Sequence, residues 1–525
     1  MTPRVRTNLR VPMQDGTMLA TDTYLPPGPR PVPVLLLRTP YGKDTHRAEG
    51  LGWARRGFGL VVQDVRGRYD SGGVWEPYAN ERLDGAITVN WVANQPWCAG
   101  SVVVMGGSYA SFTAWTVALS GHPAICAVIS LVPAVGVHTC YGPGGVLYLA
   151  SHVRWWLANG DGAIRRDGLF EAMYRAQPEV FAHLPVSELG DILWADVPTW
   201  FDPAKAGPGA VPAYAVTDAE LAALALPALH VGGWYDGFLE RSLQQWRVAG
   251  SAVRPRPARS LLIGPWTHEL RTDQLVRHGE RRHGPAARVA LGRVLVEWLS
   301  AVLDGSARDS TAQVYVCGAE QWHTAADWPG ATRTDTWYAA AGGTLRPDPP
   351  SGGGQDIFCY DPADPFPSRS VPADRTDLDR RSDATRYLTP ELAHPCELAG
   401  TPEVELHAST DAPATDWVAR LLEVTPAGSR RHLSQGVLDT AQVSGRPLGE
   451  QPHAYRIRLT PLAVRLPAGH RFCLEITSSD FPDHARNLNT GADRLTTIEM
   501  RTATQQVHYG PDTPTALLLP VRPGS

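Results

Sequence analysis

Three residue types that together hydrolyse esters and amides occur in this sequence at positions that suit the chemistry. Ser108 lies in MGGSYASF, Asp236 in GWYDGF and His268 in GPWTHEL. A serine hydroxyl is a weak nucleophile at neutral pH and needs a histidine base, which a carboxylate must orient. Taken singly, each residue has a commoner role as a helix cap, a turn residue or a loop residue. Their joint occurrence in the order Ser, Asp, His predicts a catalytic triad.

Each of these residues follows an expected β-strand. The apolar runs that we expect to form strands cover residues 31–38, 57–65, 102–105, 124–132, 227–233 and 259–265. Helical spacing occurs between them, at Leu83, Ile87 and Trp91, and again over residues 289–305. Strands that alternate with helices predict a parallel sheet covered on both faces. The pentapeptide GGSYA (106–110) then matches the sharp strand-to-helix turn G-x-S-x-G, with alanine in place of the last glycine.

Ester hydrolysis also needs donors for the negative charge that develops on the substrate's carbonyl oxygen. The backbone N–H of Tyr109, next to Ser108, is one expected donor of this oxyanion hole. The loop RTPYGK (38–43) follows an early strand and offers the phenol of Tyr41 as a second. From the residues alone, a turn tyrosine packed against the sheet is an equally good interpretation of Tyr41.

The bulk composition is that of a folded soluble protein without a polyanionic partner. The chain has 525 residues, 43% apolar and 19% charged, with a net charge of −5, so we expect no nucleic acid and no membrane surface as partner. Seven cysteines without a C-x-x-C pair predict neither a disulfide framework nor a zinc site. H-E-x-x-H and phosphate-loop motifs are missing, so we expect no metal and no cofactor. The N-terminal stretch lacks the apolar core of a secretion signal, and we expect a cytoplasmic protein. The composition leaves the oligomeric state open, and a homodimer is compatible with it.

The chain divides into an α/β part, an insertion and a β-rich part. Residues 1–134 and 225–329 carry the alternating strands and helices of one core domain. Between them, residues 135–224 are rich in aromatic residues, and we expect a helical cap over the pocket in which Trp155 and Trp156 line the substrate site. From residue 330 to 525, short alternating runs such as EVELHAST and AYRIRLT are separated by turn residues and predict a β-sandwich. The expected cap aromatics include Phe170, Tyr174, Phe181, Trp194, Trp200 and Phe201.

Several ordered motifs resemble one family of serine hydrolases. RTPYGK, QDVRGRYDSGG, GGSY, GWYDGF and GPWTH, followed by YDPADPFPS, LPAGHRF and SSDFPDHARNLNTG, are similar to the cocaine esterase, X-prolyl dipeptidyl-peptidase and α-amino-acid ester hydrolase family. The resemblance implies an α/β-hydrolase fold with an inserted helical cap and a C-terminal all-β jelly-roll domain. It also implies the triad Ser108, Asp236 and His268, with Tyr41 and Tyr109 as the oxyanion hole. Phe238 is implied to line the acyl pocket.

The sequence favours a carboxylic ester as substrate and leaves two alternatives. Family members that bind a free α-amino group carry two acids shortly after the triad aspartate, whereas Asp236 is followed here by Gly237, Phe238 and Leu239. This pattern resembles the cocaine esterase-like members, and the aromatic cap favours a bulky or aromatic acyl group. The cap acids Asp161, Asp167 and Glu171 leave an X-prolyl or amino-ester hydrolase open, whereas we expect Glu240 to turn away along the helix that follows Asp236. An acyltransferase or cyclase that uses the same triad is the other alternative. Asp64, Arg66 and Gly67 resemble a D-x-R-G turn of this family, for which we expect a structural ion pair.

Overall fold

The computed structural model describes most of the chain. It covers residues 2–134, 136, 140–193, 199–274, 276–307, 309–330, 332–369, 374–443, 448–449 and 451–523. Trp194, which we expected among the cap aromatics, lies outside the described residues. Among the described residues, there is no helix with the length and apolar character needed to cross a membrane.

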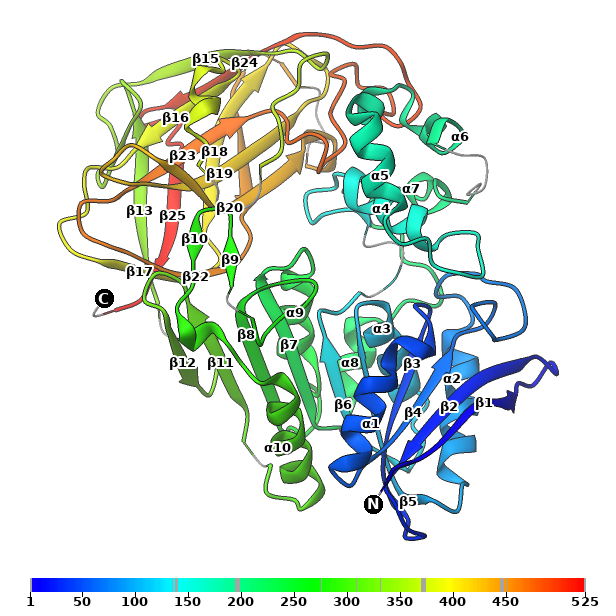
Figure 1. The fold of residues 1–525 in the computed structure, drawn as a ribbon. Helices are drawn as coiled ribbons and strands as arrows, with labels where there is room; N and C mark the ends of the chain where they lie inside the picture. The colour runs from blue at the N-terminus through cyan, green and yellow to red at the C-terminus, as the bar shows by residue number, and fades with distance from the viewer. Residues whose placement is uncertain are drawn as a thin grey trace.

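A mostly parallel sheet forms the centre of the first domain (Figure 1). Its strands, in spatial order, are β1 (Arg4–Pro12), β2 (Met18–Leu25), β4 (Gly59–Asp64), β3 (Val32–Thr39), β5 (Cys98–Gly107), β6 (Ile125–Leu131), β7 (Ala228–Tyr235), β8 (Arg259–Thr267), β11 (Thr311–Val316) and β12 (Gln321–Ala325). The run from β4 to β11 is parallel, and β1, β2 and β12 are antiparallel at the two edges. The carboxyl ends of β3 to β8 therefore meet at one edge.

Helices cover both faces of this sheet, and its inner strands are buried along most of their length. Leu35 and Leu37 of β3 belong to a cluster with Trp53 of one helix, whereas Val34 and Leu36 belong to the cluster on the other face. The helices are α1 (Arg47–Arg55), α2 (Glu81–Ala93), α3 (Tyr109–Ala118), α9 (Leu239–Val248) and α10 (Leu291–Leu303). Strand order and layering are those of the α/β-hydrolase fold, which the sequence resemblance implied.

The segment between β6 and β7 is helical. It contains α4 (Leu149–Asn159), α5 (Leu169–Ala176), α6 (Leu189–Leu193), α7 (Asp202–Lys205) and α8 (Asp218–Ala223). Figure 1 shows α4 to α7 above the α/β domain and next to the C-terminal domain, whereas α8 lies low, beside α9. Backbone hydrogen bonds join this cap to the C-terminal domain, from Ala150 to Pro482, from Ala485 to Leu147 and from Ser187 to Leu495. The cap is thus bonded to both of its neighbours, since α8 also accepts the amide of Gly250.

The C-terminal domain consists of β-strands. They are β13 (Arg333–Ala340), β14 (Thr344–Arg346), β15 (Gly354–Tyr360), β16 (Ala384–Leu388), β17 (Cys396–Gly400), β18 (Glu403–Thr410), β19 (Asp416–Val424), β20 (Arg430–Asp439), β21 (His453–Arg458), β22 (Leu462–Leu466), β23 (Arg471–Thr477), β24 (Ala503–Tyr509) and β25 (Ala516–Val521). The hairpin β9 (Arg277–His278) and β10 (Arg281–Arg282) reaches it from the α/β domain through the ion pair between Arg281 and Glu423. An all-β domain agrees with the prediction, while its jelly-roll topology stays a prediction.

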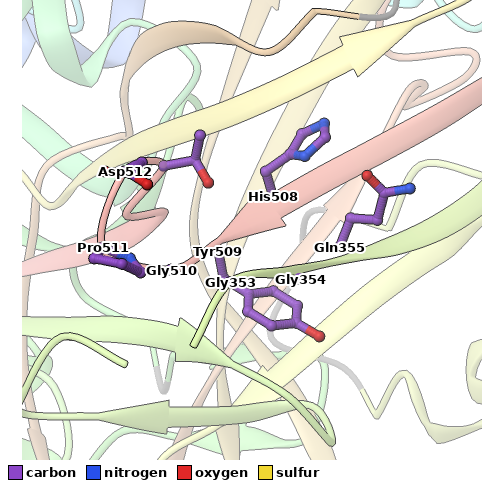
Figure 2. Close-up of a pocket in the computed structure, with 9 residues that line it drawn as sticks. Gly353, Gly354, Gln355, His508, Tyr509, Gly510, Pro511 and Asp512 are labelled. Carbon is purple, nitrogen blue, oxygen red and sulfur yellow. The ribbon is translucent and has the colours of Figure 1, made fainter. Parts of the chain in front are cut away.

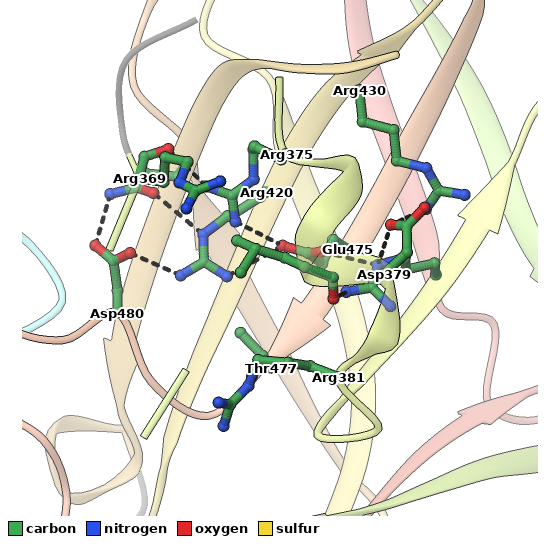
Figure 3. A network of polar contacts seen from close by, with 12 residues as sticks. Arg369, Arg375, Asp379, Arg381, Arg420, Arg430, Glu475, Thr477 and Asp480 are labelled. Atoms are coloured by element: carbon green, nitrogen blue, oxygen red, sulfur yellow. Dashed lines mark hydrogen bonds and ion pairs between the residues drawn. The ribbon is translucent and has the colours of Figure 1, made fainter. Parts of the chain in front are cut away.

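A buried network of charged side chains stabilises this β domain (Figure 3). Arg420 is fully buried and lies 2.7 Å from Asp480 and 3.3 Å from Glu475. Arg375 and Arg386 also pair with Glu475, at 3.2 and 2.9 Å. Buried charges cost several kcal/mol each to remove from water, so each of them requires a partner.

Replacing Arg420 with methionine is expected to lower the free energy of unfolding by about 3–5 kcal/mol at pH 7, because the substitution leaves Asp480 buried without its arginine. Burial works to raise the pKa of Asp480, but Arg420 and His484 hold this pKa below its ordinary range. The ionised carboxylate therefore stabilises the fold above about pH 4, and this contribution is lost as the pH falls further. Urea denaturation at pH 7 and pH 3 should show a large cost of the substitution that shrinks in acid.

The matched control is Arg456→Met, because Arg456 pairs with Glu403 while 64% of its side chain is exposed. An exposed pair is worth at most about 1 kcal/mol. Equal costs for the two substitutions would contradict a stabilising role of the buried network.

Candidate active site

Ser108 lies on a sharp turn between β5 and α3. Its φ and ψ are 56° and −124°, a conformation that L-residues rarely adopt and that a nucleophile turn requires. A Cβ atom on Gly106 would lie 2.1 Å from the carbonyl oxygen of Ala110 and 2.6 Å from its Cβ. The turn therefore requires glycine at 106, because the backbone of Ala110 occupies the space that a side chain would need. The amide of Ser108 donates to the carbonyl of Leu131 at 3.0 Å, which ties the turn to β6.

Asp236 and His268 are in contact. Asp236 directly follows β7, and His268 directly follows β8. His268 Nδ1 lies 2.8 Å from Asp236 Oδ1, and this oxygen also accepts the amide of Phe238 at 3.2 Å. The aspartate side chain is fully buried, whereas 41% of the histidine side chain is exposed. A buried carboxylate thus orients an accessible imidazole, as a general base requires.

Ser108 lies on the same sheet edge as this pair. The strands β5, β6, β7 and β8 are consecutive neighbours, and their carboxyl ends carry Ser108, Asp236 and His268. In this part of the described chain, Ser108 and His268 are not joined by a hydrogen bond. Catalytic hydrogen bonds are often long without substrate and tighten in the complex. The structure thus brings together two of the three predicted triad residues in direct contact.

Tyr109 offers its backbone to the site and buries its side chain. As the first residue of α3, it has an amide N–H for which the helix has no acceptor. Its phenol donates to Glu81 Oε1 at 2.8 Å and accepts the amide of Tyr78 at 2.6 Å. Glu81 pairs in turn with Arg38, at 2.8 Å. Burial and the nearby Glu81 raise the pKa of Tyr109 well above its ordinary value, so this phenol stays protonated.

Tyr41 lies on the loop after β3, and a hydrogen bond to its backbone fixes it there. Its amide donates to Thr39 Oγ1 at 3.1 Å. Gly42, the next residue, has a φ of 92°, and a Cβ there would lie 3.0 Å from the ring of Tyr69. The rings of Tyr41 and Tyr109 are edge to face, with their centroids 6.5 Å apart. The two residues predicted for the oxyanion hole are therefore close neighbours.

Of the three predicted pocket residues, two lie beside these groups. The Phe238 ring is 5.3 Å from the imidazole of His268, and the Trp155 ring is parallel to that of Tyr109 at 6.4 Å. Trp156 is 4% exposed and packs in the apolar core of the cap. Its place in the substrate pocket stays a prediction.

The turn at residues 64–67 contains two separate sets of ion pairs. Arg66 pairs with Asp84 at 2.7 Å and with Asp15 at 2.6 Å. Asp64 accepts the amide of Lys43 at 2.7 Å and pairs with its ammonium at 3.5 Å, and burial raises the pKa of the Asp64 carboxyl to about 6. The Asp64 contacts hold the loop that carries Tyr41 against β4, and the Arg66 pairs join the turn to α2 and to the segment before β2, so both roles are structural.

A cavity of about 300 Å³ lies in the β domain (Figure 2). It opens between the ends of β15 and β24 and is lined by glycines with Gln355, His508, Tyr509 and Asp512. All of its lining residues come from the β domain, and it includes none of the residues predicted for catalysis.

Two buried groups beside the site were missed by sequence reasoning. Glu81 joins Tyr109 to Arg38, and Arg68 donates to the carbonyls of Pro40 and Asn159. Arg68 is fully buried, and burial lowers the pKa of its guanidinium. A charged residue in a polar stretch normally indicates a solvated surface, so no local pattern could have placed either side chain inside.

Comparison with known proteins gives consistent matches over the whole chain. The model of the family described as X-Pro dipeptidyl-peptidase (S15 family) matches residues 15–269, and that of the X-Pro dipeptidyl-peptidase C-terminal non-catalytic domain matches residues 304–518. Cocaine esterase of Rhodococcus sp. (strain MB1 Bresler) is 31% identical, with 98% of each chain covered. Among solved structures, an aminopeptidase from the marine sediment archaeon Thaumarchaeota archaeon and an α-amino acid ester hydrolase each have a TM-score of 0.83 and 22% identity, covering 99% of this chain and 97% of the other.

Proposed function

This chain belongs to the X-Pro dipeptidyl-peptidase (S15) family, and from that premise we propose that it is a serine hydrolase that cleaves a carboxylic ester through an acyl-enzyme intermediate. The observation that carries the proposal is the 2.8 Å hydrogen bond between Asp236 and His268, at the sheet edge that presents Ser108 on its strained turn.

In the proposed reaction Ser108 attacks the ester carbonyl while His268 accepts the hydroxyl proton. Asp236 holds the imidazole and stabilises the imidazolium. The carbonyl oxygen becomes an oxyanion that accepts hydrogen bonds from the Tyr41 phenol and the Tyr109 amide. His268 then gives its proton to the leaving alcohol, and water activated by the same histidine releases the acid. No cofactor takes part in these steps.

The groups around the site favour an acyl part that is bulky or aromatic. Phe238 lies beside His268, and Trp155 lies beside Tyr41, so an aromatic side chain adjoins both the proposed base and the proposed oxyanion donor. Flat apolar walls with few polar groups are typical of pockets that bind rings.

The acids that could bind an α-amino group already have other partners. Asp167 pairs with Arg165 at 2.6 Å, and Glu171 pairs with Arg154. Asp161 accepts the hydroxyl and amide of Thr199. A carboxylate engaged in this way binds a further ammonium less strongly, which favours an ester without a free amine over an amino-ester or X-prolyl substrate.

A matched pair of substrates tests the proposal: the p-nitrophenyl esters of phenylacetic acid and of phenylglycine, which differ only in the α-amino group. We expect turnover of both, with kcat/KM for the phenylacetate at least equal to that for the phenylglycine ester. A phenylalanine-proline p-nitroanilide serves as the X-prolyl probe. The proposed substrate class is contradicted if kcat/KM for the phenylglycine ester or for the p-nitroanilide exceeds that for the phenylacetate by tenfold or more. If the protein cleaves neither ester, the proposal of an ester hydrolase is itself contradicted.

The same reaction run with an added alcohol or amine separates hydrolysis from acyl transfer. The proposal predicts that the free acid is the main product. An ester or amide as the main product would identify the chain as an acyltransferase that uses the same residues.

A further inference from the structure

The cap places an indole N–H on the phenol of Tyr41. Trp155 lies in α4, and its Nε1 donates to Tyr41 Oη at 3.3 Å. The two residues are 114 positions apart in the sequence, so only the docking of the cap brings them together. Trp155 is also parallel to the ring of Tyr109, with an interplanar angle of 4°. It therefore contacts both residues of the proposed oxyanion hole.

A phenol oxygen that accepts one hydrogen bond keeps its own proton free to donate another. Without an outside donor, the hydroxyl of Tyr41 can flip between its two orientations in the ring plane and direct its proton away from the substrate. A donor fixed on one side of the oxygen favours the orientation in which the proton points to the other side. Preorganised donors act most strongly because they need no reorganisation during the reaction.

We propose that Trp155 is a positioning residue for the reaction: by donating to Tyr41 Oη, it directs the phenol proton of Tyr41 toward the oxyanion. This inference rests on the proposed function, in which Tyr41 is an oxyanion donor. It goes beyond the pocket-lining role expected from the sequence, because it assigns the indole nitrogen a task that a hydrocarbon ring cannot perform.

Other groups hold Tyr41 in the same arrangement. The Arg165 guanidinium lies 5.4 Å from the centre of the Tyr41 ring, where a cation is attracted to the π face. Arg68 donates to the carbonyl of Pro40, which precedes Tyr41, and to the carbonyls of Asn159 and Gly162 at the end of α4. The cap is thereby fastened to the loop at its backbone, at the ring of Tyr41 and at its hydroxyl.

A double-mutant cycle between Trp155 and Tyr41 tests the inference. Trp155→Phe keeps an aromatic ring but removes the donor. We expect kcat to fall about 3- to 10-fold, which corresponds to the loss of one neutral hydrogen bond, with little change in KM. Tyr41→Phe is expected to lower kcat about 10²- to 10³-fold. The double variant should match Tyr41→Phe within about twofold, since the indole has lost the hydroxyl through which it acts.

A purely structural or pocket-lining role would give a different result. Trp155→Phe would then lower kcat by the same factor in the Tyr41→Phe background as in the wild type, or it would change KM and leave kcat unaltered. Either outcome overturns the inference. Trp200→Phe is the control, because Trp200 packs against His152 and Phe201 inside the cap. It should leave kcat near the wild-type value in both backgrounds.

A second replacement guards against misfolding. Benzothienylalanine at position 155 keeps the size and shape of the bicyclic ring without the N–H, and it should reproduce the kcat loss of Trp155→Phe. Unchanged kcat with this residue would overturn the inference. If Tyr41→Phe itself has no effect, the inference also fails, while loss of activity in Ser108→Ala in the same assay would leave the ester hydrolase proposal standing.

Discussion

Replacing Ser108 with alanine is expected to lower kcat for ester hydrolysis by about 10⁴-fold or more, while the fold remains intact. The reason is that the acyl-enzyme cannot form without the hydroxyl, and the remaining donors can only polarise the carbonyl. Steady-state hydrolysis of a p-nitrophenyl ester measures the loss. A fluorophosphonate probe, which reacts with activated serines, should increase the mass of the wild-type protein but not that of the variant.

Ser120→Ala is the matched control for this experiment. Ser120 follows α3 at the end opposite Ser108, and its hydroxyl donates to the carbonyl of Val117. We expect kcat within about twofold of the wild-type value, because a surface substitution of this kind changes stability by at most about 0.5 kcal/mol. Full activity of Ser108→Ala, or probe labelling that persists in it, would exclude Ser108 as the nucleophile.

The parallel part of the α/β domain could be predicted from the sequence because its strands are buried on both faces. The predicted strand 227–233 corresponds to β7, Ala228–Tyr235. The predicted strand 102–105 corresponds to the buried centre of β5, Cys98–Gly107. The first residues of β5, 98–101, are small and at least partly exposed, and they are extended because Val32 of β3 pairs with Cys98. β1 escaped prediction for a similar reason: it is an edge strand whose side chains mostly face solvent.

The sheet edge also explains why part of the site could be predicted. Asp236 and His268 each follow a strand of one parallel sheet, so their order in the chain determines that they meet. The contact between Trp155 and Tyr41 does not follow from strand order in this way. It depends on how the cap docks, through contacts such as those of Arg68, and no periodicity encodes that geometry. Local patterns predicted the elements, whereas the cap contacts required the structure.

Asp236→Ala is expected to lower kcat by about 10⁴-fold, because His268 then loses both its orientation and the charge that stabilises the imidazolium. Asp236→Asn should lose less. Among the described residues, the hydrogen bonds to the Asp236 carboxylate come from His268 Nδ1 and from the Phe238 amide, and both reach the same oxygen, Oδ1. An asparagine can place its amide oxygen there and keep the imidazole in the tautomer that leaves Nε2 free to accept a proton. What it loses is the negative charge.

Measuring kcat for the two variants beside Asp218→Asn separates orientation from charge. Asp218 lies in the first turn of α8 and accepts a hydrogen bond from Gln244 at an exposed site, so its substitution should leave kcat unchanged. If Asp236→Asn is as inactive as Asp236→Ala, the amide group has turned its NH₂ toward His268, and the single-oxygen geometry does not control the tautomer. If Asp236→Ala keeps more than about a tenth of the wild-type kcat, His268 does not depend on Asp236 and the proposed triad is wrong, because a triad aspartate contributes far more than tenfold.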